Sequence, residues 1–252
     1  MLRKALLGLV ASAVLTAPAS AQTVDELVAE LAAARGGLDK LHAVRSVRML
    51  GHFVGPQGAE APVTIERKRP HSTRMELTIQ GTTSVQAFDG EQAWGTLPMG
   101  DPRLAPNLPL RMGPPEPLPP EMAKDLENQA DIEGPLVDYK AKGHQVELVG
   151  KERLDEADVW RLRVTLRSGD VIQVLLDSAS HLEVGYETKR TIRGNTIEIE
   201  SRLGDYKETG GVLWPRTISA GPKGRPERQT LRFDKIEVNP ELDDARFKLP
   251  AR

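Results

Sequence analysis

Two carboxylates flank a glycine in the stretch FDGEQAWG, and such a pair could carry acid and base chemistry. Asp89 and Glu91 stand on either side of Gly90, shortly before Trp94. Asp-Gly between two strand-like runs is also a strong signal for a two-residue hairpin turn. Glu91 has no neighbouring histidine with which to share a proton. We therefore interpret Asp89 and Gly90 as a turn, and not as a catalytic site.

The remaining histidines and serines show no catalytic spacing either. Metal sites favour histidines at i, i+4 or in one short loop, and no two of the five histidines are so placed. Ser180 and His181 are adjacent in DSASHL, but no Gly-x-Ser-x-Gly elbow precedes a helix. We predict no catalytic residue, no metal and no cofactor, and hence a protein that is not an enzyme. The histidines are His42, His52, His71, His144 and His181.

The first 21 residues have the pattern of a secretory signal peptide. Basic residues at Arg3 and Lys4 precede an apolar run, which ends at the small residues Ala19-Ser20-Ala21. We expect cleavage after Ala21 and one mature domain over residues 22–252. The chain contains no cysteine, which excludes disulfides, thiol catalysis and cysteine-bound metal. These features predict a periplasmic or secreted protein.

Charge excludes one class of partner. Without residues 1–21 the chain has 32 basic and 36 acidic side chains, a net charge of about −4 before histidine. A nucleic-acid binder would need a basic stripe, so no nucleic acid is expected. No later segment approaches the roughly eighteen apolar residues that a membrane span requires. We therefore predict a protein that does not span the membrane.

The elements that follow are mostly strands. Thr23 and Glu26 have the spacing of a capping box, which predicts a helix from about Val24 to Ala34, and residues 38–44 could form a second short helix. Beyond it, apolar and polar residues alternate with period two, and glycine-rich turns separate the runs. We count about eleven strands in meander order. The expected fold is mainly β, a strongly curved antiparallel sheet or open barrel with a few helices.

Apolar side chains on one face of these strands could line a cavity or fill a core, and the sequence leaves both open. We expect the N-terminal helix to lie across the concave face through Leu27, Val28 and Leu31. The parity of apolar residues shifts between Phe233 and Ile236, which predicts a β-bulge in the last strand. The cavity candidates are Phe53, Met75, Leu77, Trp94, Trp160, Leu162 and Tyr186.

One segment, at about residues 97–132, breaks the rhythm of strands. Nine of the nineteen prolines lie between Pro98 and Pro120, and proline cannot continue a β-ladder. A helical stripe follows within Glu121 to Ile132. Long connections of this kind are often lids or binding loops. We predict a lid over the cavity, with candidate contacts Leu104, Leu108, Leu110, Met112, Met122 and Leu126.

Several stretches together resemble bacterial outer-membrane lipoprotein-sorting proteins of the LolA type. The resemblance rests on RGGLDKLHAVRSVRMLGHF from Arg35, FDGEQAWG from Phe88, LLDSASHL from Leu175, GVLWP from Gly211 and NPELDDARFKLP from Asn239. It implies an eleven-stranded open half-barrel whose helices cover an apolar concave face that receives acyl chains. The chain is longer than a typical LolA, chiefly through the proline-rich segment.

The resemblance leaves three functions to weigh. The first is a periplasmic carrier that binds acyl chains of lipoproteins, or other lipids, for transfer to the outer membrane. Its partners would be an inner-membrane donor and an outer-membrane acceptor. The second is an envelope-stress sensor of the RseB type that binds a protein partner. The third is an enzyme whose site is assembled in space.

Overall fold

The computed structural model describes residues 22–99, 110–192 and 195–251. The helices are α1 (Val24–Ala34), α2 (Leu38–Ala43) and α3 (Pro120–Gln129), with a 3-10 turn, η1, at Asp244–Arg246. The strands are β1 (Ser46–Val54), β2 (Glu60–Lys68), β3 (Ser72–Ile79), β4 (Thr82–Phe88), β5 (Ala93–Gly95), β6 (Glu116–Pro117), β7 (Gln145–Leu154), β8 (Ala157–Thr165), β9 (Val171–Asp177), β10 (Glu183–Ile192), β11 (Asn195–Thr209), β12 (Val212–Pro222) and β13 (Gln229–Val238).

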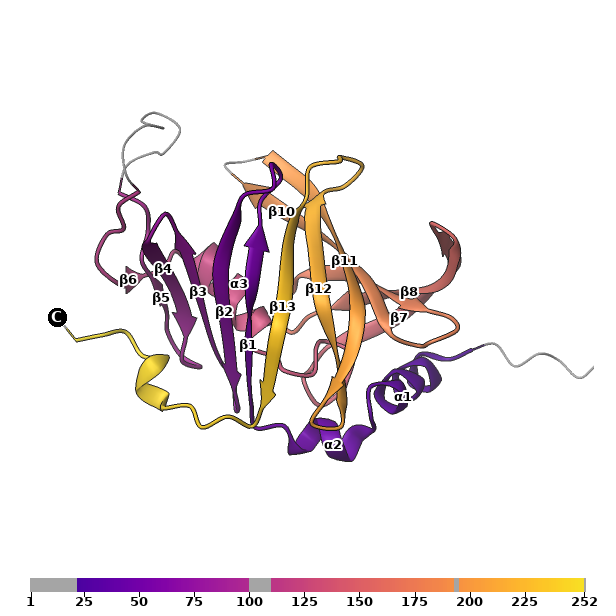
Figure 1. Ribbon diagram of the computed structural model, residues 1–252. Helices are drawn as coiled ribbons and strands as arrows, with labels where there is room; N and C mark the ends of the chain where they lie inside the picture. Colours follow the sequence, from indigo (N-terminus) through magenta and orange to yellow (C-terminus); the bar gives the residue numbers. More distant parts are fainter. Residues whose placement is uncertain (1–21, 100–109, 193–194, 252) are drawn as a thin grey trace, which may run out of the picture.

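All thirteen strands form one antiparallel sheet. Its order is β6-β5-β4-β3-β2-β1-β13-β12-β11-β10-β9-β8-β7, so the first and last long strands pair at its centre. The edge strands β6 and β7 do not meet, and the sheet stays open and strongly curved (Figure 1). The predicted open antiparallel sheet is confirmed. The expected number of about eleven strands is too low, because β5 and β6 are too short to show alternation.

The N-terminal helix begins and ends as predicted. The Thr23 side chain accepts a hydrogen bond from the backbone of Glu26, and the Glu26 carboxylate accepts one from the Thr23 backbone, which completes the capping box. Leu27 and Leu31 are buried against the inner face of β8 and β9, and Val28 packs at the edge of the same cluster. The helix therefore covers the concave face of the sheet, as expected.

The predicted bulge lies in β13. Leu50 pairs with Lys235 and Gly51 pairs with Phe233, so Asp234 is the extra residue. A Cβ atom at Gly51 would lie 1.8 Å from the Arg232 carbonyl oxygen. Only glycine fits where the bulged strand comes this close. Such a bulge bends its strand and increases the local twist of the sheet.

The FDGEQAWG stretch forms a turn, as predicted, but a longer one. Residues 89–92 connect β4 to β5, four residues where two were expected. The Asp89 carboxylate accepts hydrogen bonds from the backbone N–H groups of Glu91 and Gln92, at 3.0 and 2.8 Å. This Asx-type turn replaces the tight hairpin because the side chain of Asp89 supplies the acceptor.

Candidate functional site

The inner face of the sheet changes along its strands from buried to partly exposed. In β1, Val47 is fully buried and Met49 is 5% exposed, whereas Phe53 at the other end is only partly buried. In β12, Trp214 is buried and Ile218 is partly exposed. The helices and residues 130–142 pack on the buried end. We call this buried end the closed half.

The partly exposed end, which we call the open half, carries five apolar side chains on β1, β3, β12 and β13. Phe53 pairs with Leu231 across β1 and β13, and Leu231 pairs with Ile218 across β13 and β12. All of them border the same buried cluster, so the apolar surface is continuous with the core. The open half consists of Phe53, Met75, Leu77, Ile218 and Leu231.

The seven side chains predicted for one cavity fall into three places. Phe53, Met75 and Leu77 belong to the open half. Trp160, Leu162 and Tyr186 lie in a second cluster, with α1, on the inner face of β8 to β10.

Trp94 lies apart from the other six predicted side chains, on the outer face of the sheet. It pairs with Ala87, which pairs with Arg74, and the Arg74 guanidinium lies 5.5 Å from the Trp94 ring centroid. The Trp94 indole N–H donates to the Phe247 carbonyl at 2.7 Å, because the C-terminal segment covers the outer face here. Trp94 is therefore part of a separate, outer packing layer.

The predicted lid residues are placed in part. Leu104 and Leu108 lie outside the described residues. Leu126 is buried against Phe88 and Leu118, and Met122 packs on the same cluster, so α3 covers the inner face of β4 and β5. Figure 1 shows α3 behind these strands.

The other two lid candidates flank a short crossing of the chain. Leu110 and Met112 are partly exposed, and Pro98 and Met112 form an isolated β-bridge. The prolines do not keep the whole segment out of the sheet. Pro117 lies in the edge strand β6, where a missing N–H is tolerated.

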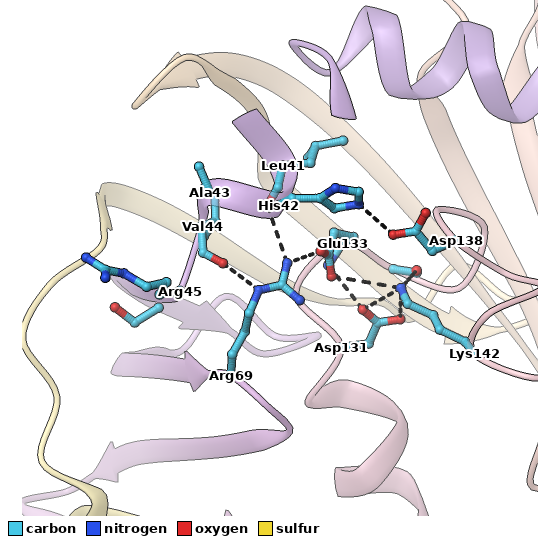
Figure 2. Close-up of polar contacts among 12 residues, drawn as sticks. Leu41, His42, Ala43, Val44, Arg45, Arg69, Asp131, Glu133, Asp138 and Lys142 are labelled. Carbon is cyan, nitrogen blue, oxygen red and sulfur yellow. Dashed lines mark hydrogen bonds and ion pairs between the residues drawn. The ribbon is translucent and has the colours of Figure 1, made fainter. Parts of the chain in front are cut away.

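A cluster of charged residues joins the segment after α3 to the closed half (Figure 2). Glu133, 3% exposed, contacts the Arg69 guanidinium, which follows β2. Lys142 donates to both oxygens of Asp131, at 2.9 and 2.8 Å, and to the Gly134 carbonyl at 2.9 Å. We call these four side chains, Arg69, Asp131, Glu133 and Lys142, the clasp.

The clasp also holds helix α2. The Arg69 Nε–H donates to the carbonyl of Val44 at 2.7 Å, and a terminal nitrogen of Arg69 lies 3.4 Å from the carbonyl of Leu41. The Leu41 carbonyl also accepts a hydrogen bond from the Val44 backbone N–H, and Val44 is the C-cap of α2. Nearby, His42 Nε2 lies 2.6 Å from a carboxylate oxygen of Asp138. The clasp therefore connects β2, α2 and residues 131–142.

A second contact reaches α1. Arg35, the C-cap of α1, donates to the Glu133 carbonyl, and its guanidinium lies 5.7 Å from the Trp214 ring centroid. Its terminal nitrogen is 3.8 Å from a carboxylate oxygen of Glu183. Burial raises the pKa of Glu183 despite this cation. Ionisable side chains thus lie inside the closed half, next to its apolar core.

The pKa values of the clasp carboxyls move in opposite directions. Burial opposes ionisation of Glu133, yet the Arg69 guanidinium and the Lys142 ammonium hold the pKa of Glu133 below its usual value. For Asp131, burial outweighs Lys142, and its pKa is raised. Glu133 is therefore the anion that the clasp stabilises, and its ionisation contributes to the stability of the closed half.

No sequence pattern predicts the clasp. Arg69 and Glu133 lie 64 positions apart, and each stands among other charged residues. An Arg-Pro step after a strand and a glutamate between two apolar residues are ordinary patterns. Only the sheet topology brings them together.

Two surface pockets lie away from the inner face. One, of about 440 Å³, is bounded by polar side chains of β11, β12 and β13, among them Arg216 and Asp234. The other, of about 600 Å³, lies at the C-terminal segment near Lys68 and Asp243. Neither is lined by a predicted cavity residue.

In the part of the chain that the structure describes, no three His, Asp or Glu side chains are grouped to hold a metal ion. No described helix is both long enough and apolar enough to cross a membrane.

Comparisons with solved structures identify the fold. A LolA superfamily protein from Nitrosomonas europaea superposes with a TM-score of 0.57 at 15% identity, over 90% of this chain and 98% of its own. A domain assigned as an outer membrane lipoprotein-sorting protein from Vibrio parahaemolyticus gives 0.52 at 14% identity, over 89% and 97%. A DUF1329 family protein from Desulfovibrio piger gives 0.54 at 12% identity, over 89% and 97%.

Comparisons of the sequence alone find no relative. No family model matches the chain, and no curated protein matches it. The structural likeness therefore establishes a LolA-like fold, as the sequence resemblance implied.

Proposed function

We propose that this protein is a periplasmic carrier that binds acyl chains on the open half of its inner face. The observation that carries the proposal is the continuous row of partly exposed apolar side chains on a sheet that does not close. A folded protein gains nothing by leaving such a surface uncovered, and exposed apolar patches commonly mark binding sites. The LolA-like fold supports the same use.

The energy available on such a surface is sufficient. Each methylene buried contributes about 0.8 kcal/mol, so a dozen methylenes give about 10 kcal/mol before the costs of opening and ordering. The binding needs no catalytic group. Residues 1–21, with their signal-peptide pattern, support export, and the donor and acceptor would be proteins of the two membranes.

Native mass spectrometry tests the proposal. The full chain would be exported to the periplasm, purified without detergent and measured intact, and its lipids would then be extracted and identified. We expect adducts of acylated molecules that disappear after delipidation and return when lipid is added. Protein that carries no lipid, and binds none when offered an acyl-chain series, would contradict a carrier function.

A matched pair of variants locates the binding. Leu77→Ser changes the open half, whereas Val149→Ser changes an exposed apolar residue of the edge strand β7, away from the open half. We expect the first to weaken lipid retention and the second to leave it unchanged. Equal retention by both variants would place the acyl chain elsewhere.

A further inference from the structure

One arginine on the inner face has no partner. Arg67 of β2 pairs in register with Val47 of β1 and Thr73 of β3, both of which are buried. Val47 belongs to the core of the inner face, so Arg67 points to the same side. Its Nε is buried without a hydrogen bond, whereas the residue as a whole is partly exposed. Within residues 22–99, 110–192 and 195–251, nothing forms a hydrogen bond or ion pair with its guanidinium.

Other arginines show how unusual this is. On the outer face, Arg48 contacts Glu66 and Glu237 at 2.8 and 3.0 Å. Arg161, also on the outer face, contacts two glutamates in the same manner. Water that reaches the exposed part of Arg67 offsets part of its charge, but the buried Nε has no acceptor among the described residues. An arginine kept on an apolar face without a partner therefore points to a ligand that supplies the missing anion.

The groups around Arg67 do not supply that anion. Burial lowers the pKa of Arg67, and the charges that act on it come from Asp131, Tyr186 and Arg35. Asp131 is already neutralised by Lys142, which contacts both of its oxygens. Arg35 is itself a cation. The surroundings of Arg67 thus leave one positive charge uncompensated.

The apolar surface leads directly to this charge. Ile65 and Val63 precede Arg67 on the same side of β2, and they pair with Met75 and Leu77 of β3. Met75 and Leu77 belong to the open half. Val63 and Ile65 are buried, whereas Met75, Leu77 and Arg67 are partly exposed. A linear chain that lies on Met75 and Leu77 and points toward the closed half would direct its end toward the Arg67 guanidinium.

We propose that Arg67 binds the carboxylate of a fatty acid whose chain lies on the open half, with its head group directed inward. This inference rests on the proposed function and names its ligand class. A guanidinium binds a carboxylate through two parallel hydrogen bonds. One carboxylate matches the single charge of Arg67, whereas a phosphate monoester carries about −1.5 to −2 and would leave negative charge that Arg67 does not compensate. A fatty acid is therefore favoured over an alkyl phosphate.

Competition against a fluorescent fatty acid tests this assignment. Three competitors of equal chain length would be used: the fatty acid, its methyl ester and the alkyl phosphate. We expect the acid to bind at least about tenfold more tightly than the ester, because the ester lacks the charge that strengthens a hydrogen bond to a guanidinium. In Arg67→Met that preference should fall to within about threefold, with ester binding unchanged.

Two further variants serve as controls for Arg67→Met. Arg163→Met removes an exposed arginine of β8 and should keep the full preference for the acid. Arg67→Lys keeps the charge but loses the paired hydrogen bonds, and should keep part of the preference. It also serves if Arg67→Met does not fold, which a thermal melt would show.

The outcomes separate the two proposals. Equal binding of acid and ester by the wild type, or an unchanged preference in Arg67→Met, would overturn the role of Arg67 while the carrier function stands. A larger preference for the alkyl phosphate would overturn the carboxylate assignment. If neither acid nor ester binds to the wild type, both the carrier function and this inference fail.

Discussion

The closed half and the open half of the inner face lie at opposite ends of the same strands and differ in how far they are covered. The closed half is sealed by α1, α2 and residues 130–142, and it contains the clasp together with most of the fully buried side chains. The open half carries apolar side chains of the same strands without that cover. The difference teaches that stability and binding can be separated along a strand. Helices that cover one end of the strands stabilise the sheet, while the other end stays available to a ligand.

The clasp offers the largest expected effect on the closed half. Arg69→Ala would leave Glu133 buried without its guanidinium and would remove the donor to the carbonyl of Val44, the C-cap of α2. We expect unfolding free energy to fall by about 3 to 5 kcal/mol, as for other broken buried ion pairs. Urea unfolding followed by circular dichroism measures it.

The matched control for Arg69→Ala is a surface pair. Lys189 and Glu198 lie 3.2 Å apart but are both exposed, so Lys189→Ala should cost less than about 1 kcal/mol. If Arg69→Ala were no more destabilising than Lys189→Ala, the clasp would not hold the closed half.

Replacing one leucine in each half compares how much the two halves contribute to stability. Leu162 is fully buried beneath α1, whereas Leu77 is partly exposed in the open half. We expect Leu162→Ala to cost about 2 to 4 kcal/mol through the cavity it leaves. Leu77→Ala should cost about 1 kcal/mol, since it removes less buried apolar area. Equal losses in thermal or urea unfolding would mean that the open half is an ordinary core.

Features set by local sequence patterns could be predicted from the sequence, whereas contacts between distant residues could not. The capping box at Thr23, the stripe of Leu27 and Leu31 and the bulge at Asp234 follow local patterns, and the sequence located them correctly. Trp94 shows the limit of alternation. Both faces of the sheet are covered near β5, so a buried aromatic residue does not reveal its face, and only the register with Ala87 assigns it.

The clasp and Arg67 mark a second limit. Their importance comes from burial and from the identity of distant neighbours, and a sequence pattern contains neither. Arg67 and Arg69 look alike in the run ERKRP, yet Arg69 binds Glu133, whereas the Nε of Arg67 has no acceptor in the part of the chain that the structure describes. Charged residues within an alternating strand are usually assigned to the solvent face, which conceals a cation on the inner face.

Acid should act on the closed half through Glu133. Its folded-state pKa lies below the ordinary value of 4.5, so its stabilising contribution is complete above that value and is lost as pH falls through the lowered one. Glu133→Gln should therefore flatten the loss of stability between about pH 5 and 3. We expect this effect on stability to be smaller than those of Arg69→Ala and Leu162→Ala.

The urea midpoint, measured at a series of pH values, reports this loss of stability in acid. Asp138→Asn, at an exposed carboxylate, is the control and should keep the wild-type slope. An unchanged slope in Glu133→Gln would show that Glu133 is not the anion that the clasp stabilises.

The most direct test of the central claim is photocrosslinking with a fatty acid that carries a diazirine along its chain. The account predicts that labelled peptides, located by mass spectrometry, contain Phe53, Met75, Leu77 or Leu231, and that excess unlabelled fatty acid abolishes the labelling. Competable labelling confined to the outer face, around Trp94 or the C-terminal segment, would contradict binding on the open half. So would the absence of any labelling that competes.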